Sequence, residues 1–89
     1  MAELDVQVVA QDHAVWSGAA RSITGRTIEG DMGILPGHTP VLSLLAEGEL
    51  TIEPVDGQTV RAHVNGGFFS VDSDKVTIVA NDAELREES

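Results

Sequence analysis

The sequence contains no cysteine, which excludes disulfide bonds and thiolate metal sites anywhere in the chain. This absence fits a protein of a reducing compartment. Aromatic residues are also scarce, since Trp16, Phe68 and Phe69 are the complete set. The chain therefore offers no platform on which the bases of a single-stranded nucleic acid could stack.

Basic residues are the next deficit: there are five, against fifteen acidic residues, and the formal net charge is −10. This charge repels phosphate backbones and anionic lipids, so we expect no nucleic-acid binding. The acidity either serves solubility or helps to select a basic partner. Apolar runs are far shorter than the ~20 residues of a membrane-spanning helix, and the acidic N-terminus lacks the regions of a signal peptide. We therefore expect no export, and membrane contact only through a partner.

Alternation of apolar and polar residues is what the sequence does have, and it recurs as far as residue 80. A chain of 89 residues has room for one domain, with a small core that a large partner would help to stabilise. Turn signals at Asp56-Gly57 and Asn65-Gly66-Gly67 separate the alternating segments. The predicted strands are residues 4–8, 20–27, 50–53, 59–64, 68–71 and 75–80. Short strands at this spacing predict an all-β sandwich or barrel.

The acidic tail is the predicted exception to this all-β pattern. Asn81 or Asp82 can cap a helix, and Glu84 lies three residues beyond Asn81, as in a capping box. We therefore predict one β domain over residues 1–81 and a short helical start over residues 82–89.

Candidate catalytic or ligand-binding chemistry is absent from the sequence pattern. His13, His38 and His63 are not spaced as metal ligands, and neither a nucleophile elbow nor a phosphate-binding loop occurs. We expect no catalytic, cofactor-binding or metal site. One alternative function is a biotinyl or lipoyl carrier domain, which would present Lys75 at a hairpin tip.

Residues 29–42 form the most informative stretch. They combine Gly30 and Gly33 with a short apolar run and two prolines, Pro36 and Pro40. This composition predicts either a rigid, exposed loop that carries Met32, Ile34 and Leu35 for protein contact, or an ordinary sandwich corner whose apolar residues belong to the core. The residues alone leave both open.

Residues 30–42, Gly-Asp-Met-Gly-Ile-Leu-Pro-Gly-His-Thr-Pro-Val-Leu, resemble a motif of the epsilon subunits of F-type ATP synthases. Trp16-Ser17-Gly18, Asn65-Gly66-Gly67-Phe68 and residues 76–80 resemble further segments of that family. The resemblance runs in order from about residue 3 to residue 85. It implies a flattened sandwich of two five-stranded sheets.

The resemblance also implies a function: a non-catalytic rotor subunit of the central stalk, which binds the gamma subunit and the membrane c-ring and couples proton flow to ATP synthesis. This place lies at the cytoplasmic face of a bacterial membrane. By resemblance, the c-ring would contact Gly30, Asp31, Met32 and Gly33, with Asp31 facing an arginine of the ring loops. The gamma subunit would contact His38, Thr39, Val41 and Leu42.

The family usually continues into a C-terminal helical hairpin with inhibitory or ATP-sensing roles. This sequence has only residues 82–89 in that place, which we interpret as the stub of the helical region. We therefore do not expect those roles of it. A generic β-sandwich adaptor that binds neither rotor subunit is a further alternative.

Overall fold

Every regular element of the fold is a β-strand. The computed structural model describes residues 3–11 and 13–87, and within them no residue is helical. No helix in this part of the chain could therefore cross a membrane. The prediction of an all-β fold is confirmed. The strands are β1 (Leu4–Ala10), β2 (His13–Thr27), β3 (Gly30–Ile34), β4 (Val41–Pro54), β5 (Val60–Asp72), β6 (Lys75–Ala80) and β7 (Ala83–Glu87).

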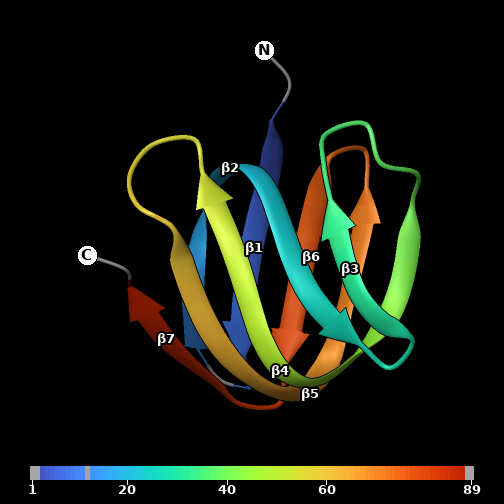
Figure 1. The fold of residues 1–89 in the computed structure, drawn as a ribbon, viewed down its shortest axis with the longest axis vertical. Coiled ribbons are helices and arrows are strands. Elements are labelled where there is room, and N and C mark those ends of the chain that lie inside the picture. Colours follow the sequence, from blue (N-terminus) through green and yellow to red (C-terminus); the bar gives the residue numbers. More distant parts are fainter. Residues whose placement is uncertain (1–2, 12, 88–89) are drawn as a thin grey trace.

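The strands pair in the order β1-β6-β5-β4-β2-β3, with β7 on β5 and a further pairing of β1 with β2. All pairs are antiparallel except β1 with β6. Figure 1 shows the result as two layers that face each other. The hydrogen bonds join all the strands into one seven-stranded sheet, whereas the resemblance implied a sandwich of two five-stranded sheets. The reason is length: β2, β4 and β5 have 15, 14 and 13 residues, and each passes from one layer into the other.

The bend of β5 lies at Gly66 and Gly67, which the sequence predicted as a turn between two strands. Their φ angles are +84° and +127°, in the region that favours glycine. Before the bend β5 pairs with β7, and after it with β6. Hydrogen bonds from Asn65 N to Asp82 O (3.0 Å) and from Asn81 N to Gly66 O (3.1 Å) continue the ladder across the bend. The positive φ was predicted correctly, but the chain bends there without reversing.

The predicted C-terminal helix is wrong, because residues 83–87 form strand β7. The backbone of Asn81 and Asp82, which we expected to cap a helix, instead bonds to β5. A helix of barely two turns gains too few hydrogen bonds to be stable alone, whereas an extended segment pairs at once with the free edge of β5.

The core lies between the two layers and follows the predicted alternation. On β1 and β6 every second residue is buried, as predicted, and the same is true of the first half of β5. Leu50 and Ile52 on β4 also belong to the core, with exposed fractions of 2% and 1%. In the predicted strands 4–8, 59–64 and 75–80, the buried residues are Leu4, Val6, Val8, Val60, Ala62, Val64, Val76, Ile78 and Ala80.

Strand β3 replaces the exposed loop that was one of the two predictions for residues 30–34. Ile34 pairs with Ile23 of β2 and is buried, and Met32 packs against the core. Strand alternation turns both side chains inward, so neither is an exposed anchor. Leu35, one residue beyond the strand, is exposed as predicted.

Candidate docking surface

An apolar patch covers the outer face of the first half of β4 and the second half of β5. Leu42, Leu44 and Phe68 have exposed fractions of 72%, 57% and 40%. Leu44 and Phe68 are directly paired across the two strands, so their side chains are neighbours. Together with Leu42 and Ser43 they line an open hollow of about 380 Å³, which has room for side chains of a partner.

The tip of the β2–β3 hairpin extends this surface. Ile28 is 64% exposed, and its backbone N–H donates to Leu44 O at 3.2 Å, which fixes the tip beside β4. The buried Thr27 holds the tip in shape, because its hydroxyl donates to Gly30 O at 2.8 Å and accepts from Glu29 N at 3.1 Å. We call Ile28, Leu42, Leu44 and Phe68 the apolar patch. Apolar clusters of this kind on a small acidic protein mark a contact surface.

The outer surface of the other layer is charged instead. Arg26 Nε lies 3.2 Å from Asp31 Oδ1, Arg61 Nη1 lies 3.7 Å from Glu49 Oε1, and His63 Nε2 lies 3.5 Å from Glu47 Oε2. All six side chains are more than 40% exposed, so water screens these pairs and each contributes little to stability. This outer surface therefore carries charged pairs, whereas the outer face of the other layer carries the apolar patch.

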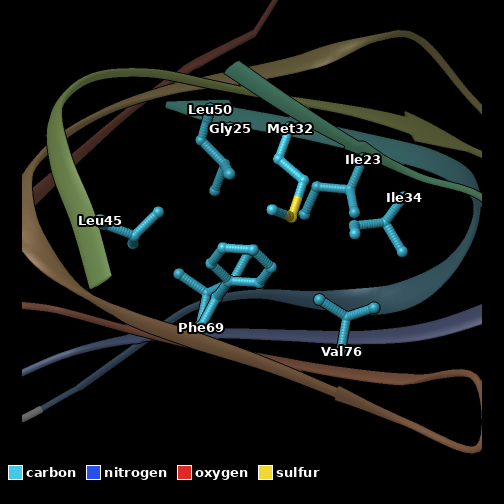
Figure 2. A pocket seen from close by; sticks show the side chains of 9 residues that line it. Ile23, Gly25, Met32, Ile34, Leu45, Leu50, Phe69 and Val76 are labelled. Carbon is cyan, nitrogen blue, oxygen red and sulfur yellow. The ribbon is translucent and has the colours of Figure 1, made fainter. Parts of the chain in front are cut away.

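The residues predicted to contact the c-ring lie on the β2–β3 hairpin, and the structure separates them. Gly30, Asp31 and Gly33 are exposed, and the carboxylate of Asp31 accepts a hydrogen bond from Arg26 Nε. Met32 points into the interior, as Figure 2 shows, so its side chain is not part of that outer surface. Asp31 belongs to the charged surface, through its pair with Arg26.

The residues predicted to contact the gamma subunit are also divided. Leu42 is in the apolar patch, whereas Val41 is partly buried against the core. His38 Nδ1 lies 2.6 Å from Thr39 O, within the segment 35–40 that connects β3 to β4. Ile28, Leu44 and Phe68 were not among the residues predicted to make contacts. The signal available for Leu44 was its spacing of two residues from Leu42, which puts both on one strand face.

A small cavity lies inside the sandwich. Figure 2 shows a small cavity among apolar side chains, including Ile23, Met32 and Phe69. Its volume is about 10 Å³, at most the space of one water molecule, so it cannot hold a substrate. Among the described residues no three His, Asp or Glu side chains gather as metal ligands. Lys75 is the first residue of β6, and the hairpin tip is formed by Ser73 and Asp74, unlike the arrangement expected of a carrier domain.

Comparison with known proteins identifies relatives over nearly the whole chain. Residues 3–86 match the family model "ATP synthase, Delta/Epsilon chain, beta-sandwich domain", a range that includes the first four residues of β7. The ATP synthase epsilon chain of Micrococcus luteus is 52% identical over 85 residues, which cover 96% of this chain and 93% of that one. The epsilon chain of Streptomyces avermitilis is 48% identical over 87 residues and is covered over 70% of its length.

Solved structures agree with this assignment. A chain of the Euglena gracilis mitochondrial ATP synthase OSCP/F1/c-ring assembly superposes with a TM-score of 0.89 at 31% identity, over 96% of this chain and 54% of its own length. A chain of the Tetrahymena thermophila central stalk and c-ring, 21% identical, has the same fold, with a TM-score of 0.74 over 91% of this chain and 65% of its own. This chain thus spans between half and two thirds of those solved chains. It belongs to the β-sandwich domain family of ATP synthase delta and epsilon chains.

Proposed function

We propose that this chain is a non-catalytic rotor component of an F-type ATP synthase, which links the gamma subunit to the c-ring and so helps to couple proton flow to ATP synthesis. Its close relatives are named epsilon chains, and the Euglena chain that it resembles comes from an F1/c-ring assembly. In such a complex the protein would be peripheral to the membrane, at its cytoplasmic face in a bacterium. The observation that carries the proposal is the apolar patch, which gives a chain without a catalytic constellation a surface for docking.

The apolar patch is proposed as the gamma-binding surface. Burial of apolar area is worth about 25 cal/mol per Å², and three of its four members are more than half exposed before binding. Leu42 comes from the predicted gamma-binding set, and its neighbours supply the rest of the contact. His38 and Thr39, in the segment that leads into β4, would lie at its margin, while Val41 supports Leu42 from the core side.

Replacing Leu44 by aspartate tests this surface. A charge at the centre of the apolar patch should raise the Kd for the gamma subunit by about 100-fold, as at interface hot spots, because the carboxylate would be buried without a partner. Val55→Asp is the matched control, since Val55 is an exposed residue outside the apolar patch. Calorimetric titration of both variants against gamma is the measurement. The assignment would be refuted if both substitutions weakened gamma binding equally, or if neither weakened it.

The exposed β2–β3 hairpin is proposed as the c-ring edge, with Asp31 as its charged contact and Gly30 and Gly33 providing close backbone approach. Met32 would support this edge from inside. Asp31 already pairs with Arg26 at 3.2 Å, so a basic residue of the ring would have to compete with that exposed pair. Removing Arg26 should therefore strengthen ring binding.

Reversing the charge of Asp31 should weaken association with the c-ring by about tenfold, and more at low salt, because an attractive pair becomes a repulsive one. Glu29→Lys is the control: it changes the net charge equally at an exposed position two residues away. Binding to purified c-ring at two salt concentrations measures both variants. If Glu29→Lys has the same effect as Asp31→Lys, net charge and not this site decides ring binding.

One structural expectation belongs to the same proposal. The strand registers support a sandwich with five strand segments in each layer, in which the two halves of β2, β4 and β5 are counted separately.

A further inference from the structure

The segment 35–40 reaches the apolar patch but lies outside every strand. It connects the end of β3 to Val41 and Leu42 at the start of β4. Two hydrogen bonds lie within it, from His38 N to Leu35 O (3.1 Å) and between His38 Nδ1 and Thr39 O (2.6 Å). These local bonds shape a turn but do not attach it to the sandwich.

Asp74 attaches this segment to the fold. It sits at the tip of the β5–β6 hairpin, 37 residues away in sequence, and its Oδ1 accepts a hydrogen bond from Gly37 N at 2.7 Å. This donor–acceptor distance lies at the short end of the usual range for N–H···O hydrogen bonds. Figure 1 shows the β3–β4 connection and the β5–β6 hairpin at the same end of the molecule.

The position of Asp74 itself is well fixed. Its carbonyl accepts a hydrogen bond from Asp5 N at 2.8 Å, which joins the hairpin tip to β1. Its φ of +63° and that of Ser73, +52°, form a tight turn with two left-handed residues. Aspartate tolerates this conformation better than most residues other than glycine and asparagine. The carboxylate is therefore held by a rigid support.

We propose that Asp74 is a positioning residue for docking: its carboxylate holds residues 35–40 in one conformation and so presents the start of β4 ready for the partner. This inference rests on the proposed binding of the gamma subunit to the apolar patch. Without the bond the segment must be ordered on binding, and that lost conformational freedom lowers the affinity. Asp74 acts through Gly37 and need not touch the partner.

Three variants of the hairpin test this role. Asp74→Gly removes the carboxylate and suits the positive φ, so the turn and the fold should survive. Asp74→Asn keeps an oxygen acceptor for Gly37 N, and asparagine also tolerates the left-handed region. This variant should therefore retain the hydrogen bond to residues 35–40. Ser73→Gly makes an equivalent backbone change in the same turn but leaves Asp74 in place.

The measurements are amide exchange of Gly37 by NMR and the Kd for the gamma subunit. Asp74→Gly should speed exchange at Gly37 and raise the Kd, each on the order of tenfold, whereas Asp74→Asn and Ser73→Gly should stay near wild type. An unchanged Kd for Asp74→Gly, with wild-type binding intact, overturns the inference and leaves the proposed function standing. Failure of the wild-type chain to bind gamma overturns the proposed function itself, and is seen before any variant is compared.

Discussion

Replacing Gly67 by alanine is expected to unfold most of the protein. A Cβ at this position would lie 2.1 Å from Val79 O and 2.8 Å from Ala80 Cα, both backbone atoms of the paired strand β6. The φ of +127° is also one that alanine rarely adopts. Relief requires β5 and β6 to separate at the bend, where the core strands meet. We expect a loss of about 4 kcal/mol or more in the free energy of unfolding, close to the whole stability of a small domain.

Gly57→Ala is the matched control for this substitution. Its φ of +98° is similarly unfavourable for alanine, but no atom lies within 4 Å of the added Cβ. Only the backbone strain then remains, at about 1–2 kcal/mol. Urea denaturation followed by circular dichroism compares the two variants. If both variants lost a similar amount of stability, β5 and β6 would be able to separate at the bend at no cost. The close approach of Gly67 to the β6 backbone would then not limit the side chain at this position.

The strands that the sequence predicted well are those that lie in a single layer. The bounds of β6 were predicted as residues 75–80, and those of β1 within two residues, because each strand keeps one face toward the core throughout. Alternation then has an unbroken period of two. The inward positions Val6 and Val76, paired in the parallel register of β1 and β6, followed from that period alone.

The long strands were predicted only in part, because each changes layers. In β4 the buried positions are Leu45, Leu50, Ile52 and Pro54. Leu45 and Leu50 lie five positions apart, an odd interval, so the alternation shifts phase between them, at the crossing. In β5 the two glycines resemble a turn in sequence. The sequence does not show that the strand continues past them, paired with β7 before the bend and with β6 after it. The bend depends on contacts distant in sequence, which no local pattern contains.

The candidate site was harder to predict for the same reason. Leu42 was selected through a resemblance, whereas Leu44 and Phe68 stand out only when their exposed faces are known. Phe68 and Phe69 are identical residues in adjacent positions, and sequence cannot tell which one points outward. The register of β5 against β4 and β6 decides it.

This pair provides the second large prediction. Phe69→Ala should cost about 3–5 kcal/mol of unfolding free energy, since Phe69 is 5% exposed and its ring fills the core beside Leu45 and Leu50. The neighbouring Phe68→Ala should cost less than about 1 kcal/mol, because its ring is 40% exposed. Thermal and urea denaturation of the two variants measure the difference.

Binding should show the opposite order. Phe68→Ala removes one quarter of the apolar patch and is expected to weaken binding of the gamma subunit by tenfold or more, as at other buried aromatic contacts. Phe69→Ala should be assayed at low temperature, where a fraction of the protein remains folded. When the apparent Kd is corrected for that folded fraction, its affinity for gamma should be close to that of the wild type. A one-residue slip of β5 would exchange the two rings and reverse both orders. Loss of stability from Phe68→Ala with full retention of binding would thus refute the register and the docking surface together.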